Sequence, residues 1–178
     1  MQATSLTSAE KGTIMHLVMQ QIDVTKEITE ADLEHLKVHL VQQEFLREDQ
    51  LEAINNESII RFFQSDIAKR MRHAKVLQRE LPFSMGISAK EAYPHYEGPE
   101  ETVLIQGVID CLFEDEQGLV LLDYKTDRIT GKFPGGFEEA KSVLEKRYQV
   151  QINLYTRAIE EILNTTLEEK YLYFFDDG

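Results

Sequence analysis

The chain has 178 residues, of which 42% are hydrophobic, and its formal net charge at pH 7 is −13. This size and apolar content predict one domain with its own core, and the absence of an apolar run of about 18 residues excludes a membrane span. The single cysteine, Cys111, excludes an internal disulfide, and the negative charge argues against nucleic-acid binding by this chain alone, because phosphate contacts need Lys and Arg.

Residues 1–74 are predicted to be helical. Thr7-Ser-Ala-Glu10 has the spacing of a capping box, and an apolar stripe at helical spacing follows it. Further helices are predicted over residues 30–45, 48–54 and 57–73.

Two groups of basic side chains in this region have more than one interpretation. His35 and His39 share a helix face, but no third ligand accompanies them, so a solvated face is predicted. The basic run 69–75 either complements the dipole at a helix C-terminus or contacts phosphate.

From Lys75 the apolar period becomes that of a strand, and residues 76–85 are predicted to be extended. The stretch Gly86–Glu101 contains Pro94, Gly98 and Pro99, which predict an irregular surface excursion.

Two strands joined by a polar turn are predicted between Val103 and Tyr124. Folding this hairpin about Glu116 and Gln117 places Asp110 directly opposite Asp123, and opposed residues point to the same side of a sheet. Lys125 lies two residues beyond Asp123 and joins that face. Cys111 then lies on the other face, as a buried small apolar residue.

Two carboxylates and an ammonium therefore converge at the end of the hairpin. Carboxylates that are this close repel one another unless a cation or a proton lies between them. Oxygen ligands suit Mg²⁺ or Mn²⁺, which lower the pKa of a bound water, and a lysine can orient that water or stabilise a phosphoryl transition state. The cluster predicts a metal-assisted phosphodiester hydrolase; the alternative is a surface hairpin that carries ordinary charges.

After the hairpin, residues 127–136 are predicted to form a glycine-rich loop and Phe137–Leu163 a helix, on which Tyr148, Gln151 and Tyr155 share a face. A closing strand is predicted over Glu169–Phe175, after which the chain stops at Asp176-Asp-Gly178. No Walker A pattern occurs, so no ATPase is expected in this chain.

Gly-Val-Ile-Asp110 followed by Leu-Leu-Asp123-Tyr-Lys125-Thr-Asp127 resembles the core motif of the PD-(D/E)XK nucleases, and in particular their RecB-like branch. Gly-Thr-Ile-Met-His16, Arg-Glu80-Leu-Pro-Phe and Gln151-Ile-Asn-Leu-Tyr155 resemble the other motifs of that branch, in the family's order. One departure is Gly-Val-Ile, which stands where a proline can precede the first aspartate. The resemblance covers nearly the whole chain.

The resemblance implies an α/β restriction-endonuclease-like fold, with a central mixed sheet flanked by helices. It implies one nuclease domain, 1–178, with a helical region over residues 1–74 and a catalytic core over residues 75–178. The catalytic residues that it implies are Asp110, Asp123, Lys125 and Glu80. Mg²⁺ or Mn²⁺ would be held by His16, Asp110, Asp123 and the carbonyl of Tyr124. The substrate would contact Gln151, Tyr155 and Tyr148.

Glu-Lys-Gly-Thr-x-x-His16 and Tyr148-x-x-Gln151-x-x-x-Tyr155 resemble more narrowly the C-terminal nuclease domains of the AddA (RexA) family of helicase–nuclease proteins. That resemblance implies a cytoplasmic exonuclease domain that hydrolyses single-stranded DNA delivered by a helicase during double-strand-break repair and recombination. The implied partners are the helicase domains of a longer chain, which alone would use ATP, and an AddB (RexB) protein. No membrane partner is expected, because there is no long apolar run, and one cysteine cannot ligate the iron–sulfur cluster that some RecB-like nucleases carry.

Two alternatives stay open. One is a stand-alone RecB-like nuclease of the Cas4 type, against which the single cysteine counts, because such enzymes usually carry several cysteines for a cluster. The other is a catalytically inactive module that grips DNA, against which the intact Asp110, Asp123 and Lys125 count.

Overall fold

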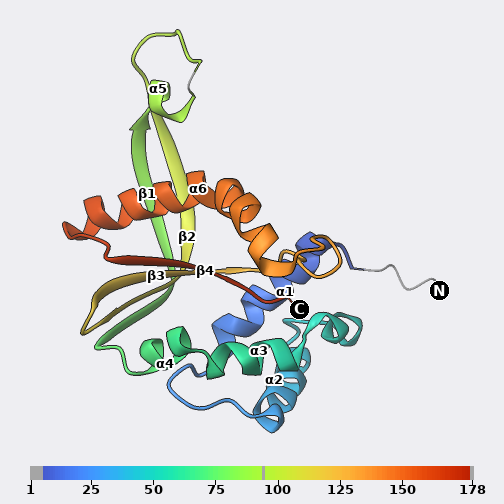
Figure 1. Cartoon of the computed structure of the whole chain (residues 1–178). Coiled ribbons are helices and arrows are strands. Elements are labelled where there is room, and N and C mark those ends of the chain that lie inside the picture. Colours follow the sequence, from blue (N-terminus) through green and yellow to red (C-terminus); the bar gives the residue numbers. More distant parts are fainter. Residues whose placement is uncertain (1–5, 94, 177–178) are drawn as a thin grey trace.

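The structure is a computed structural model that describes residues 6–93 and 95–176 (Figure 1). Its elements, in chain order, are α1 (Ser8–Gln21), α2 (Glu30–Gln42), the 3₁₀ helix η1 (Glu48–Ala53), α3 (Asn56–Gln64), α4 (Asp66–Arg72), β1 (Val76–Ser88), α5 (Ala89–Ala92), β2 (Thr102–Asp115), β3 (Gly118–Lys125), α6 (Gly136–Leu163) and β4 (Glu169–Phe174). The strands form one mixed sheet in the order β1-β2-β3-β4, in which only the β3–β4 pair is parallel. This confirms the predicted α/β class.

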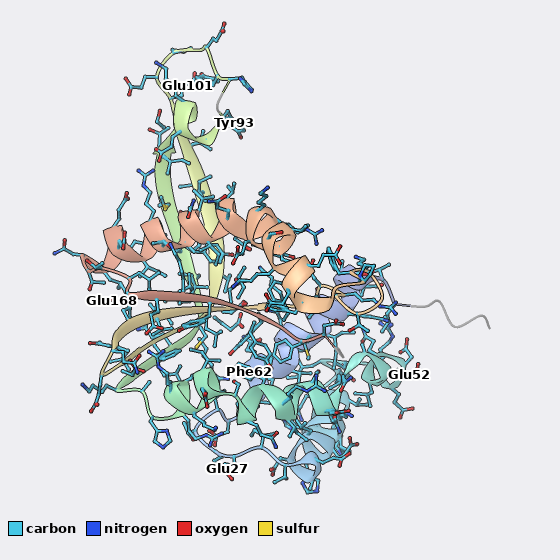
Figure 2. The ribbon with its side chains drawn as sticks, in the orientation of Figure 1. Glu27, Glu52, Phe62, Tyr93, Glu101 and Glu168 are labelled. Atoms are coloured by element: carbon cyan, nitrogen blue, oxygen red, sulfur yellow. The ribbon has the colours of Figure 1, made fainter. Side chains whose placement is uncertain are left out.

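Helices cover both faces of the sheet (Figure 1). Cys111, Leu122 and Tyr124 point to one face and pack against α1 to α4, whereas Leu121 points to the other and packs under α6. Phe62 of α3 lies between the N-terminal helices and the sheet (Figure 2), and its side chain is fully buried. Among the described helices, none has the length and apolar character needed to cross a membrane.

The hairpin register agrees with the prediction. The β2–β3 ladder pairs Cys111 with Leu122 and Asp115 with Gly118, which is the register that leads to Asp110 opposite Asp123. Gly118 has a φ of 118°, which glycine adopts without the steric cost of a side chain. Cys111 is completely buried, as predicted.

The predicted helix over 57–73 is wrong, because the chain forms two helices that meet at Ser65. Ser65 is extended, with φ −67° and ψ 157°. Its hydroxyl donates to the carbonyl of Phe62 and accepts from the amide of Ala68, so one side chain caps both helices. The second predicted helix also ends earlier than residue 45, at Gln42.

The predicted excursion over Gly86–Glu101 is also partly wrong. Strand β1 continues to Ser88, with Gly86 paired to Leu104 and Ile87 buried, and α5 follows directly. Strands β1 and β2 therefore form a long arm that projects from the sheet, with Tyr93 and Glu101 near its tip (Figures 1 and 2). Pro94, on which the prediction partly rested, lies outside the described residues, as do the final two residues of the chain.

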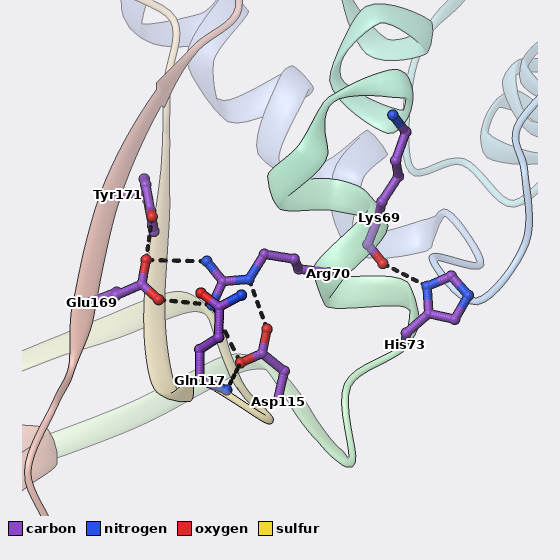
Figure 3. A network of polar contacts seen from close by, with 7 residues as sticks. All are labelled: Lys69, Arg70, His73, Asp115, Gln117, Glu169 and Tyr171. Carbon is purple, nitrogen blue, oxygen red and sulfur yellow. Dashed lines mark hydrogen bonds and ion pairs between the residues drawn. The ribbon is translucent and has the colours of Figure 1, made fainter.

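Arg70 shows how the basic run at the end of α4 is used (Figure 3). Its guanidinium donates to Asp115 at 2.7 Å and to Glu169 at 2.8 Å, and so joins α4 to the β2–β3 turn and to the start of β4. The Arg70 hydrogen bonds hold the pKa of both carboxyls below its usual range. This contact favours the structural interpretation of the basic run over phosphate binding.

We expect Arg70→Met to lower the free energy of unfolding by about 1–3 kcal/mol, between the values typical of exposed and buried ion pairs, because two partly buried carboxylates lose their cation. Both pKa values are lowered in the folded state, so the contribution is present above the ordinary values of 3.8 and 4.5 and disappears as the pH falls below them. Urea unfolding at neutral and acidic pH measures both effects. Arg61→Met removes an exposed pair with Glu57 and should have a far smaller effect; an equal effect would contradict the role assigned to Arg70.

Candidate active site

The site forms at the point along the β1–β2 arm where alternate side chains of β1 change from one face of the sheet to the other. Leu77 of β1 packs with the N-terminal helices, whereas Leu81 and Phe83 pack with α6, although all three lie at odd positions of one strand. Glu80 lies at the change, with a φ of 51° that a non-glycine residue rarely adopts. The β1–β2 ladder is regular on both sides but omits the pair Glu80–Asp110. Glu80 and Asp110 thus hold opposed positions of the two strands, close enough for the charge of Asp110 to raise the pKa of Glu80.

The side chain of Asp110 lies at the point where the hydrogen-bonded pairing of β2 with β3 ends. The ladder between these strands ends at Cys111–Leu122, and the next free amide of β3, that of Tyr124, donates to Oδ2 of Asp110 at 2.7 Å. The other oxygen, Oδ1, lies 3.1 Å from Nδ1 of His16. The side chain is buried, so its position is fixed on both sides.

Helix α1 brings His16 to this point. Its face toward the sheet carries Gly12, where an added Cβ would lie 3.1 Å from Oγ1 of Thr126, so the absence of a side chain lets the helix come close. The hydrogen bond with Asp110 raises the pKa of His16, and the charges of Asp110, Asp123 and Glu80 act in the same direction, while burial opposes them.

Asp123 is the most deeply buried carboxylate of the site, with 2% of its surface exposed. Nζ of Lys125 lies 2.5 Å from its Oδ2, as an ion pair. Burial raises the pKa of Asp123, the charge of Lys125 opposes this, and the charge of Asp110 adds to it. Burial also raises the pKa of Glu80, and the charge of Asp110 again adds to it.

Three contacts hold the ammonium of Lys125. Besides Asp123, it donates to Oε1 of Gln151 at 2.7 Å and lies 4.3 Å from the centre of the Tyr148 ring. Gln151 in turn donates to the hydroxyl of Tyr155 at 3.0 Å. Of the three residues predicted on α6, the structure therefore brings Gln151 and Tyr148 to Lys125 and Tyr155 to Gln151.

Asp127 is a site residue that sequence reasoning missed. It accepts from the hydroxyl of Tyr148 and from Arg147 at 2.5 Å, and so ties the segment after β3 to α6 beneath Lys125. The available signal was its position in Asp-Tyr-Lys-Thr-Asp127, but its partners on α6 lie about twenty residues away and have no fixed spacing.

The residues present fit a divalent cation. Within residues 6–93 and 95–176, no three His, Cys, Asp or Glu side chains stand in a ready-made metal arrangement; His16 pairs with Asp110, and Lys125 pairs with Asp123. Yet Asp110 and Asp123 are both buried, and desolvation disfavours the charge on Asp123 and Glu80. Buried carboxylates close to one another and an imidazole form a donor set that a cation would stabilise. Tyr124 is the next residue after Asp123 in β3, so its carbonyl lies beside these carboxylates. Its side chain packs in the core formed with the N-terminal helices.

Comparisons with known proteins agree with this geometry. A family model described as the PD-(D/E)XK nuclease superfamily matches residues 2–177. The chain is 51% identical over 178 residues to the A subunit of the ATP-dependent helicase/nuclease of Bacillus licheniformis, and 49% identical over 177 residues to the protein of the same name from Bacillus cytotoxicus. These matches cover 100% and 99% of this chain but only 14% of the length of each relative.

Proposed function

Because the chain belongs to the PD-(D/E)XK nuclease superfamily and is a hydrolase of the nuclease class, we propose that it forms the DNA exonuclease domain of a larger helicase–nuclease. In this proposal residues 1–178 are one domain, in which the helical region of residues 1–74 carries His16 to the catalytic core of residues 75–178. The relatives that it matches are about seven times longer, which supports a domain that works beside other domains.

One observation carries the proposal. His16, Asp110, Asp123 and Lys125 come from three separate elements and meet where β2 leaves β3, with Glu80 opposite Asp110 on β1. A structural role alone does not account for this cluster, since burying carboxylates beside one another destabilises the fold.

Members of this superfamily generally use divalent metals. In the proposal His16, Asp110, Asp123 and the carbonyl of Tyr124 would hold Mg²⁺ or Mn²⁺. The chemistry that such an ion supplies when bound is stabilisation of charge on a phosphoryl oxygen and a lower pKa of a bound water. At this site such an ion would offset the repulsion between Asp110 and Asp123.

The chain's own residues position the reactants. Lys125, held by Asp123, Gln151 and the Tyr148 ring, orients the attacking water and stabilises the negative charge that develops on the phosphate. Gln151 and Tyr155 orient the strand through the amide and hydroxyl that already point to the site, with Tyr148 beside them. Glu80 would act as a further catalytic carboxylate beside Asp110.

The substrate in this proposal is single-stranded DNA that helicase domains of the same polypeptide deliver in the cytoplasm, during double-strand-break repair and recombination. The net charge of −13 supports delivery by other domains, because an acidic surface repels phosphates. A second protein of the AddB (RexB) kind would complete the assembly. ATP would be used only by the helicase domains.

The substrate class can be tested by competition. We expect this chain to cut end-labelled single-stranded DNA with Mg²⁺ or Mn²⁺, and unlabelled single strands to inhibit more strongly than the same mass of blunt duplex. Equal inhibition by duplex would contradict the single-strand assignment while leaving the nuclease site intact.

Gln151→Ala is expected to reduce the cleavage rate by roughly 10- to 100-fold, because Lys125 loses a hydrogen bond that fixes its ammonium. Losses of this size are typical when a residue that orients a ligand or catalytic group is removed. Single-turnover cleavage measures this. Gln149→Ala, at an exposed position on the same helix, serves as the control. An unchanged rate for Gln151→Ala would show that the Lys125–Gln151 contact has no catalytic role.

A further inference from the structure

Arg79 caps the helix that carries His16. Its Nη1 donates to the carbonyl of Met19 at 3.0 Å and to that of Ile22 at 2.9 Å, both at the C-terminal end of α1. The last turn of α1 contains no basic residue of its own. A guanidinium from β1 therefore satisfies carbonyls that the helix leaves unpaired and faces the negative end of its dipole.

Two features limit the position of α1 on either side of His16. Gly12, about one turn before it, leaves no room for a side chain beside Thr126, since an added Cβ would lie 3.1 Å from Oγ1, and Met19, about one turn after it, accepts a hydrogen bond from Arg79. The rest of the interface is apolar, with Ile14, Met15 and Val18 buried. Apolar packing tolerates small shifts along a helix axis, whereas directional hydrogen bonds fix the position.

Arg79 lies beside the carboxylates that His16 must meet. It directly precedes Glu80, and its ladder partner Cys111 directly follows Asp110. The same short stretch of β1 thus places a carboxylate at the site and holds the end of α1. A shift of α1 of about 1 Å would break the 3.1 Å contact between His16 and Asp110.

We propose that Arg79 is a positioning residue for metal binding, which acts by fixing α1 so that the His16 imidazole lies at Asp110. The inference rests on the proposed function, because it assumes that His16 is a metal ligand. It assigns no contact between Arg79 and metal or DNA.

The test is a double-mutant cycle in Mn²⁺ affinity, measured by calorimetric titration of the whole chain without DNA. Arg79→Met is expected to weaken Mn²⁺ binding about tenfold while His16 is present, the lower end for outer-shell partners of a metal site. In the His16→Ala background the same change should weaken binding less than about twofold, because the group through which Arg79 acts is gone.

Arg72→Met is the matched control. Arg72 also donates to a carbonyl in the last turn of a helix, that of Phe63 in α3, but this helix carries no site residue. Arg72→Met should lower stability to a similar extent and leave Mn²⁺ affinity unchanged. If Arg79→Met does not fold, Arg79→Lys, which keeps the stem and the charge but has no forked donor, is used in the same cycle with the same expected pattern.

The outcomes separate the two proposals. Equal losses for Arg79→Met in both backgrounds would overturn the positioning role, because Arg79 would then act without His16. An unchanged affinity in His16→Ala, or no Mn²⁺ uptake by the unsubstituted protein, would overturn the proposed metal ligands themselves and the inference with them.

Discussion

Replacing Lys125 by alanine is expected to reduce the rate of DNA cleavage at least about 10³-fold while the protein stays folded and still binds metal. The expected size is that of removing a group that stabilises charge in the transition state. Lys125 is the only cation that the structure places against the buried Oδ2 of Asp123 within residues 6–93 and 95–176. A metal ion at the site could take over that electrostatic role, but not the donation of a proton or hydrogen bond to the reacting groups.

Single-turnover cleavage and Mn²⁺ titration on the same preparation test this prediction. Lys141→Ala, at an exposed position on α6, is the matched control and should cut at the normal rate. If Lys125→Ala cuts DNA at the rate of the unsubstituted protein, the role assigned to Lys125 is wrong. If it loses Mn²⁺ binding as well, Lys125 supports the metal site rather than the reaction.

Asp110→Asn is expected to abolish both functions: Mn²⁺ affinity should fall by roughly 100-fold or more, and cleavage should fall with it. The amide oxygen of asparagine can still accept the hydrogen bond from the Tyr124 amide. The geometry at which β2 separates from β3 is therefore preserved. The change removes a charge that raises the pKa of Asp123, and it also removes the charged partner of His16; these effects oppose each other, so the free energy of unfolding should change by less than about 1 kcal/mol.

Calorimetric titration with Mn²⁺ and urea unfolding measure these two effects separately. Glu114→Gln removes an exposed carboxylate from the same strand and should alter neither. A variant at Asp110 that keeps its Mn²⁺ affinity would exclude this residue from the metal site, whereas lost affinity together with a large loss of stability would show a structural role instead.

Local sequence patterns predicted the region of the fold that places Asp110 and Asp123. The alternation of apolar residues and the turn at Gly118 determine the hairpin register, because a slip of one residue would turn every side chain to the other face. Capping boxes at Thr7 and Thr29 likewise mark their helices, since both hydrogen bonds of each box are local.

The features that were not predicted depend on contacts between distant residues. The break at Ser65 is the exception: its cause is local, because the Ser65 hydroxyl bonds Phe62 and Ala68, each three residues away, but the continuous apolar stripe across it favoured a single helix. The left-handed conformation of Glu80 lies where the side chains of β1 change from one face of the sheet to the other, and no glycine or asparagine marks it in the sequence. The partners of Asp127 and Arg79 lie on α6 and α1, so neither residue carries a local signal of its role.

The most direct test of the nuclease site is cleavage of end-labelled single-stranded DNA by this chain and by its Asp123→Ala variant, each with Mg²⁺, with Mn²⁺ and with EDTA. We expect the unsubstituted chain to yield short products only with a divalent metal, and the variant to yield none under any condition. Cleavage that persists in Asp123→Ala or in EDTA would show that the cluster of Asp110, Asp123 and Lys125 is not the nuclease site.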